Sequence, residues 1–332
     1  MLKKILQYVI PLVISIGLCY LLFTGIDFNE MITTIRNECN FWWIGLALFV
    51  SIFSHVFRAL RWRIQLRALN IDAPLGALIL SIFGTYAVNL VFPRLGEVWR
   101  TTYIAQRQKA SFTTVFGSMV ADRLADTVTV LFLTLITFIL ATGEISKYLS
   151  QNTDSYEKML ALATSPWLWV GVFALIGATW FVFTRFKQNA VVAKIIDFAK
   201  GLWIGFAAIA KMKGKGQWLI YTFAIWGCYF FQLFVAFFAF KDTTAVVENY
   251  GVIAVLVCFV LSSIAMGVPS NGGIGPWQWA VMFGLSLYGL SMEGSISLAF
   301  ANLVLGAQTL LLIVLGIITF IAIALEKRRA TA

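Results

Sequence analysis

Residues 89–100 read Asn-Leu-Val-Phe-Pro-Arg-Leu-Gly-Glu-Val-Trp-Arg, directly after an apolar run that begins near residue 75. Pro93 removes a backbone donor and favours the end of a helix, and Gly96 permits close backbone approach. Three charged residues recur at three-residue spacing, which places them on one helical face: Arg94, Glu97 and Arg100. This interruption of an apolar segment by charge and helix breakers decides the predicted fold.

The composition indicates a membrane protein. Apolar residues make up 60% of the 332 positions and charged residues 12%, whereas soluble domains carry about 25% charged residues. Runs of about 20 apolar residues, enough to cross a hydrocarbon core, recur along the chain. We therefore predict an all-α polytopic protein with about six to eight transmembrane helices. The predicted spans are roughly 5–24, 41–60, 75–93, 112–142, 166–184, 217–240, 252–268, 276–290 and 296–325.

The basic residues predict the orientation, because they concentrate on the cytoplasmic side of membrane proteins. All but five of the 25 lysine and arginine residues lie at the two termini and in the segments 57–74, 94–111 and 185–216. We expect a multi-pass protein of the bacterial inner membrane with both termini in the cytoplasm. The net charge of +10 has this topological origin, so nucleic acid is not an expected partner.

The same charges predict two re-entrant hairpins. The segments 57–74 and 94–111 are both basic although one apolar span separates them, so residues 75–111 should enter the membrane from the cytoplasm and return. Residues 252–290 form a second pair of apolar spans that is interrupted by helix breakers and bounded by loops on the non-cytoplasmic side. We expect this pair to be a hairpin that enters the membrane from that side.

The hairpins divide the chain into two halves of the same order and opposite orientation. We predict one transmembrane domain, 1–332, with halves at about 1–145 and about 160–326. Inverted repeats with broken helices are common in secondary transporters, where the broken segments form the substrate site. Residues 187–215 carry apolar side chains at helical spacing and are predicted to be a cytoplasmic amphipathic segment.

A cluster of arginine and aromatic residues, 55–63, ends the second span and reads His-Val-Phe-Arg-Ala-Leu-Arg-Trp-Arg. Guanidinium groups bind phosphate oxygens bidentately, so Arg58 and Arg61 are candidates for binding a lipid headgroup. The alternative is ordinary anchoring at the membrane interface, which is the interpretation that we favour for Arg63 and Arg67.

The motif Asp122-Arg123-Leu-Ala-Asp126 lies within the long span that begins at residue 112. A charge at the bilayer centre costs about 2.5 to 3.5 kcal/mol on insertion scales, so these three residues need partners or water. Arg123 can pair with Asp126, and the two carboxylates can meet Arg94 or Arg100. The alternative is a structural ion-pair cluster. Because ionisable residues in membranes are usually functional, we include all three in the predicted site.

Residues 269–278 read Pro-Ser-Asn-Gly-Gly-Ile-Gly-Pro-Trp-Gln. This composition cannot form a regular helix, and bare N–H groups before a helix start at Pro276 favour an anion-binding nest. The candidates here are Asn271, Gly272, Gly273 and Gln278.

No metal site or cofactor is predicted. The chain has one histidine and four cysteines without CxxC spacing, and it contains no nucleophile motif. The carboxylates of Asp122 and Asp126 nevertheless leave a membrane transferase with an acidic base as an alternative.

At these residues the sequence resembles the flippase-like family known as the lysylphosphatidylglycerol synthase transmembrane region. The resemblance implies re-entrant helices and a role in moving lipids, such as aminoacylated phosphatidylglycerol, between leaflets. The family usually carries a glutamate soon after the glycines, where this chain has Gln278, and no aminoacyl-transfer domain follows before Ala332. The motifs that carry the resemblance are Arg58 to Trp62, Phe92 to Glu97, Asp122 to Asp126 and Pro269 to Gly275.

We therefore predict a lipid flippase or transporter rather than an enzyme. A membrane-embedded transferase acting on a lipid-linked substrate and a scaffold for a separate lipid-modifying synthase are the alternatives. Lipids with an anionic headgroup are the expected partners, and a homo-oligomer and a separate synthase are left open. In this hypothesis four arginines attract the headgroup and three acidic residues balance the charge: Arg58, Arg61, Arg94 and Arg100, with Glu97, Asp122 and Asp126.

Overall fold

The computed structural model describes residues 28–92, 95–143, 212–268, 270 and 272–331, together with isolated residues between 146 and 181. Every regular element in these residues is a helix. In chain order they are α2 (Phe28–Glu38), α3 (Phe41–Ala68), α4 (Leu75–Val91), α5 (Leu95–Arg107), α6 (Phe112–Leu140), α11 (Lys215–Ala236), the 3₁₀ helix η1 (Phe237–Ala239), α12 (Lys241–Ala265), α13 (Pro276–Ser286) and α14 (Ser295–Thr331).

Five described helices are long and apolar enough to cross a membrane: Phe41–Ala68, Phe112–Leu140, Lys215–Ala239, Lys241–Ala265 and Ser295–Glu326. The helix α4 is apolar but shorter. The predicted polytopic all-α membrane protein is thus confirmed. The predicted span 5–24, most of the span 166–184 and residues 187–211 of the amphipathic segment lie outside the described residues.

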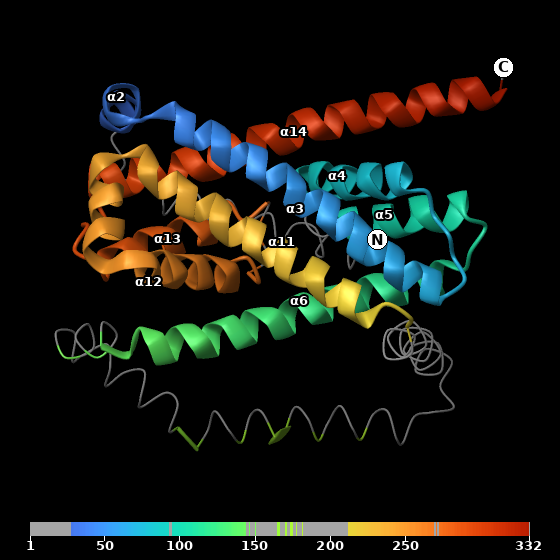
Figure 1. Ribbon diagram of the computed structural model, residues 1–332, viewed down its shortest axis with the longest axis horizontal. Coiled ribbons are helices and arrows are strands. Elements are labelled where there is room, and N and C mark those ends of the chain that lie inside the picture. The colour runs from blue at the N-terminus through green and yellow to red at the C-terminus, as the bar shows by residue number, and fades with distance from the viewer. Residues whose placement is uncertain are drawn as a thin grey trace.

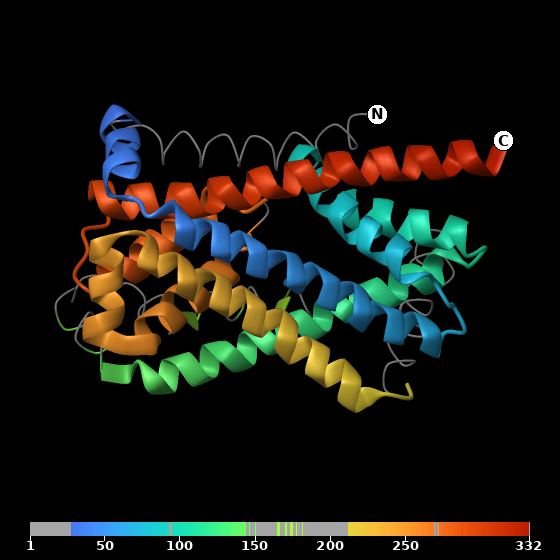
Figure 2. The same ribbon diagram turned by 45° about the horizontal axis from the view of Figure 1, so that its top comes forward.

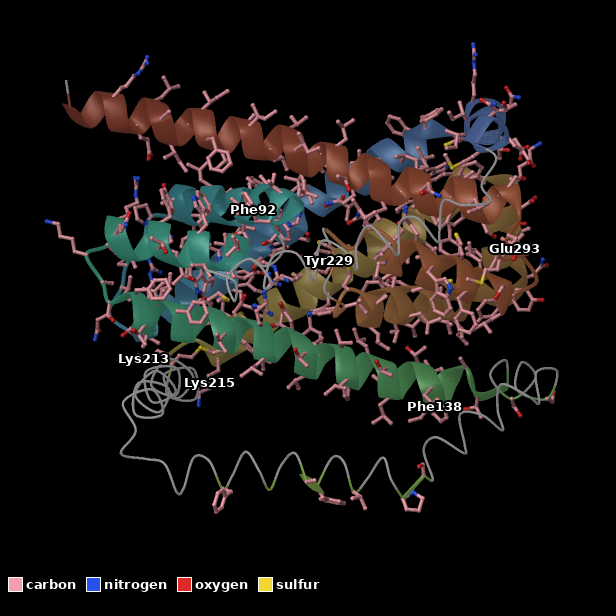
Figure 3. All side chains as sticks on the ribbon, turned by 180° about the vertical axis from the view of Figure 1, so that it is seen from behind. Phe92, Phe138, Lys213, Lys215, Tyr229 and Glu293 are labelled. Carbon is pink, nitrogen blue, oxygen red and sulfur yellow. The ribbon has the colours of Figure 1, made fainter. Side chains whose placement is uncertain are left out.

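The exposed surface of α6 is apolar, as expected for a helix in contact with lipid chains. In water, the continuous row of exposed apolar side chains on this helix would be unfavourable. A lipid environment removes that cost. Figure 3 shows one member, Phe138, on the side of α6 that faces away from the bundle. The exposed row comprises Val128, Leu131, Phe132, Leu135, Phe138 and Ile139.

Most of the long helices run along one axis, and a helical hairpin lies at each end of the bundle. In Figures 1 and 2, α3, α6, α11 and α14 extend lengthwise. The hairpin of α4 and α5 lies at the end where α14 finishes, and the hairpin of α12 and α13 lies at the end near α2. The two hairpins therefore enter the bundle from opposite ends.

Each hairpin has its own apolar core. The core around α4 and α5 contains Trp62, Leu78, Ile82, Ile104 and Val115. The core around α12 and α13 contains Phe237, Val255, Cys258, Val281 and Phe300. Both cores draw residues from the long helices, so burial of apolar surface holds each hairpin in the bundle.

A side-chain hydrogen bond closes the turn between α4 and α5. The backbone N–H of Gly96 donates to Asn89 Oδ1 at 2.8 Å, which satisfies one of the free N–H groups at the start of α5. A Cβ atom at Gly96 would overlap the backbone oxygen of Thr85. Glycine is needed here because α5 begins in direct contact with the backbone of α4.

The helix α12 is interrupted at Gly251, where φ is 68° and ψ is −160°. Its second part, residues 252–265, forms the hairpin with α13, and the turn between them ends at Pro276, the first residue of α13. Proline suits that position because it lacks the N–H that a helix start leaves unpaired. The break lies directly before residue 252, the first residue of the predicted apolar span 252–268.

The tips of the two hairpins touch. Gly272 lies in the second tip with a φ of +64°, and a Cβ atom there would come within 2.8 Å of Leu90 Cδ2 near the end of α4. Figure 3 places Phe92, at the first tip, near the middle of the long axis. Two segments that are far apart in the sequence thus meet near the middle of the long axis, where Val91 and Phe92 are exposed.

The close approach at Gly96 gives a stability test. We expect Gly96→Ala to lower the free energy of unfolding by about 1–3 kcal/mol, because the added methyl overlaps backbone that cannot move freely. Thermal unfolding of the detergent-solubilised protein measures this change. Gly76→Ala is the matched control, since a Cβ atom at that position in α4 has no neighbour within 4 Å. Equal melting temperatures for the two variants would contradict the packing described at the turn.

Candidate functional site

A buried cluster of four charged side chains joins α3 to α6. Arg58 Nη1 lies 2.7 Å from Asp126 Oδ2 and 3.5 Å from Asp122 Oδ2. Arg61 Nη2 lies 2.7 Å from Asp122 Oδ1 and 2.8 Å from Asp126 Oδ1. All four residues are buried, with Asp126 the most exposed at 9%. We call these residues the tetrad.

Helical spacing explains how the tetrad forms. Arg58 and Arg61 are three residues apart on α3, and Asp122 and Asp126 are four apart on α6, so each pair lies on one helical face. Each guanidinium bridges both carboxylates, and the two positive and two negative charges cancel. Removal of one partner would leave an uncompensated buried charge, which costs about 3–5 kcal/mol.

The tetrad corrects one expected pairing. The sequence suggested that Asp122 and Asp126 meet arginines of the first hairpin, but in the structure their close partners are Arg58 and Arg61 of α3. The expected pair of Arg123 with Asp126 is present but long, at 4.0 Å. Arg94 lies outside the described residues.

A second ion pair connects α6 to the first hairpin. Arg123 Nη2 lies 2.7 Å from Glu97 Oε1, and Asn89 Nδ2 donates to Glu97 Oε2 at 3.2 Å. Asn89 also accepts the hydrogen bond from Gly96 that closes the turn. Consecutive polar contacts therefore link the hairpin turn, through Asn89 and Glu97, to α6.

Arg100 is buried without an ion pair. Its side chain is 1% exposed, and none of the ion pairs in the described part of the chain includes it. Its Cζ atom lies 4.4 Å from the ring centroid of Trp62, a favourable cation–π distance. The indole Nε1 of Trp62 donates to Ser118 Oγ at 3.0 Å. Arg100 Nε and Nη2 have no hydrogen-bond partner.

Aromatic and hydroxyl groups that the sequence did not single out complete the site. Arg58 Nη2 donates to the hydroxyl of Tyr229 at 3.4 Å, and that hydroxyl lies 3.5 Å from the hydroxyl of Tyr86. Arg61 Nη1 donates to Thr222 Oγ1 at 3.4 Å. Figure 3 shows Tyr229 near the middle of the molecule. A tyrosine within a predicted apolar span is only a weak sequence signal, because such residues are also common at membrane interfaces.

The second hairpin contributes uncharged polar groups. Gln278 Oε1 accepts a hydrogen bond from the N–H of Gly275 at 2.7 Å, and its Nε2 donates to Asn302 Oδ1 at 2.6 Å. Gln278 thus caps the start of α13 and connects it to α14. Gly272 and Gly273 both have positive φ in the adjacent turn, and Asn271 lies outside the described residues. No group of metal-binding side chains is found among the described residues.

Comparison with known proteins gives a family match over nearly the whole chain. The lysylphosphatidylglycerol synthase TM region matches residues 8–323. The UPF0104 membrane protein of Methanocaldococcus jannaschii is 23% identical over 284 residues, which cover 81% of this chain and 82% of that relative. No solved structure gives a significant match.

The coupling within the tetrad is directly measurable. We expect Arg61→Met or Asp122→Asn alone to destabilise the protein by about 3–5 kcal/mol, because each leaves a buried charge without its partner. The double variant should lose less than the sum of the single losses, with a coupling energy of about 1–3 kcal/mol. Thermal unfolding in detergent measures all three variants.

The control for this cycle is Asp72→Asn, which removes an exposed carboxylate that Arg67 contacts at 2.9 Å. Its melting temperature should equal that of the wild type, because exposed pairs contribute little. Additive losses in the tetrad cycle would show that Arg61 and Asp122 do not stabilise one another.

Proposed function

The chain belongs to the lysylphosphatidylglycerol synthase transmembrane-region family, and on this basis we propose that it moves an anionic lipid between the two leaflets of a membrane. The polar cluster between the first hairpin, α3 and α6 binds the headgroup, and the acyl chains remain among the apolar surfaces of the long helices. The lipid is the partner in this proposal, and no covalent change of the lipid is part of it.

The observation that carries the proposal is the unpaired charge of Arg100. The described cluster holds four guanidinium groups and three carboxylates, so one positive charge is uncompensated: Arg58, Arg61, Arg100 and Arg123 against Glu97, Asp122 and Asp126. A buried cation without a counter-ion is unfavourable in a membrane. An anion beside Arg100 removes that cost.

The unpaired polar atoms around the tetrad are mainly donors. Arg58 Nε, Trp218 Nε1 and two nitrogens of Arg100 are buried without a hydrogen-bond partner. The Trp218 ring lies 5.6 Å from Arg61 Cζ, so this indole is close to the tetrad. Such groups fit a ligand rich in acceptors, and the oxygens of a lipid phosphate have this chemistry.

The geometry of the carboxylates favours transport over the transferase alternative. A general base needs a carboxylate oxygen that can reach a substrate proton. Asp122 Oδ1 and Asp126 Oδ1 are each within 2.8 Å of Arg61 Nη2, and Asp126 Oδ2 is held by Arg58. In this proposal Arg58 and Arg61, which the sequence assigned to the headgroup, mainly hold the tetrad, and Arg100 makes the principal headgroup contact.

The proposed topology places both hairpins as re-entrant segments of two inverted halves. Helix lengths support this: α4 spans about 26 Å, α5 about 20 Å and α13 about 17 Å at 1.5 Å per residue, against a hydrocarbon core of about 30 Å. The opposite entry of the hairpins and the contact between their tips support it further.

The proposed orientation places the first hairpin on the cytoplasmic side of a bacterial inner membrane, with both termini there. Lys213 and Lys215 lie at the end of the molecule that holds this hairpin, and Glu293 lies at the opposite end (Figure 3). Basic residues collect on the cytoplasmic side.

Lipid movement by Arg100 variants tests the proposal. We expect purified protein in proteoliposomes to move a fluorescent phosphatidylglycerol between leaflets, measured by dithionite quenching of the outer leaflet. Arg100→Gln should slow this movement about tenfold or more, because hydrogen bonds to charged groups contribute about 1.5–3 kcal/mol. Arg67→Gln is the matched control, since Arg67 is 54% exposed and should leave the rate unchanged.

Two results would contradict the proposal. One is a wild-type protein that moves no anionic lipid. The other is a folded Arg100→Gln variant with the wild-type rate. A new covalent lipid species made by the purified protein would instead favour the transferase.

A further inference from the structure

His55 is a buried titratable group that the proposed headgroup site does not use. It is the one histidine of the chain and is 3% exposed on α3. Neither Nδ1 nor Nε2 has a hydrogen-bond partner. A neutral imidazole has one donor and one acceptor, and burial of both without partners is costly. The side chain is therefore poorly explained as a purely structural polar residue.

His55 lies between the charged tetrad and an uncharged hydrogen-bonded chain. Arg58 of the tetrad follows it by three residues on the same face of α3. Ser51 precedes it by four residues, and its Oγ accepts from Gln308 Nε2 at 2.8 Å. Gln232 Nε2 then donates to Gln308 Oε1 at 2.9 Å. Polar groups of α3, α11 and α14 thus continue beyond the tetrad, away from the basic end of α3.

The titratable and charged groups around His55 are few. On α3 the nearest is Arg58. On α4 it is Tyr86, whose ring centroid lies 4.7 Å from that of His55, and Tyr86 is the one titratable residue of that helix. On α11 it is Tyr229, which contacts both Tyr86 and Arg58. On α6 the carboxylates of the tetrad bind Arg58, and α14 has no titratable side chain between Ser295 and Leu325.

This environment links protonation of His55 to the presence of an anion in the charged cluster. The positive charge of Arg58 opposes a second positive charge on His55, and the surrounding cluster already has one cation in excess. An anion in the cluster neutralises that excess charge and favours the imidazolium form. By thermodynamic reciprocity, a proton on His55 strengthens anion binding by the same factor.

We propose that His55 binds one proton when an anionic lipid occupies the cluster, so that lipid and proton cross the membrane together in the same direction. This inference rests on the proposed lipid transport. The proton is taken from water on the side where the lipid enters and is released to water on the side where it leaves, so no other reactant is needed. A proton gradient is then the energy source for net lipid movement.

A transmembrane pH gradient tests the coupling. The full-length protein is reconstituted with fluorescent phosphatidylglycerol, and potassium with valinomycin holds the membrane potential at zero. With one proton per lipid, the label should accumulate in the leaflet that faces the alkaline side, up to about tenfold for one pH unit. Without a gradient the label should distribute equally.

Substitution assigns the effect to His55. His55→Gln keeps a polar side chain but cannot take up a proton, so the accumulation ratio should fall to about one. Ser54→Ala is the matched control in the same helix, because Ser54 Oγ already bonds to the Ser51 carbonyl at 2.7 Å. It should accumulate lipid as the wild type does. A second measurement uses the wild type alone: lipid moving into the inner leaflet should acidify the lumen, reported by trapped pyranine.

The outcomes separate the two proposals. Wild-type protein that moves lipid without a response to the gradient and without lumenal acidification overturns the coupling only. A folded His55→Gln variant with the wild-type accumulation ratio overturns the assignment to His55. Wild-type protein that moves no lipid overturns the transport function and the coupling with it.

Discussion

The ion pairs between α3 and α6 are the constraint on which the rest of the bundle depends. Two buried guanidinium and two buried carboxylate groups are stable only while each contacts its oppositely charged partners. This requirement fixes the rotation of α3 and α6 about their axes. With α6 held in that rotation, Arg123 reaches Glu97 at the start of α5. Ser118 on the same helix orients Trp62, against which Arg100 packs. The first hairpin is therefore positioned by polar contacts as well as by its apolar core.

The two hairpins have the same arrangement but different chemistry. The first is surrounded by charged groups, whereas amides connect the second through Gln278 and Asn302. A symmetric pair of charged hairpins would bury twice as many ions and would need twice as many compensating partners. The two hairpins therefore differ chemically, although they lie at opposite ends of the bundle.

Much of the fold follows from periodicity and charge, but the partners within the site do not. Apolar runs, the distribution of lysine and arginine, and the interruption at Pro93 predicted an all-α membrane protein. The contact of Gly272 with Leu90 and the bonds of Arg58 and Arg61 to α6 depend on how distant helices pack. Spacing in one helix states only which residues share a face. Tyr229 was missed because a phenol in an apolar helix gives no such pattern.

The break at Gly251 sets the angle between the two parts of α12. Its φ of 68° with a ψ of −160° is accessible almost only to glycine, and the space where a Cβ atom would stand is empty. Two torsion angles, rather than packing at that point, define the angle between the two parts of α12. The 14 residues after the break form an arm of about 21 Å. A rotation of about 10° at Gly251 would displace the far end of that arm by about 4 Å, comparable to the width of a hydrocarbon chain. Gly251 therefore has the geometry of a hinge.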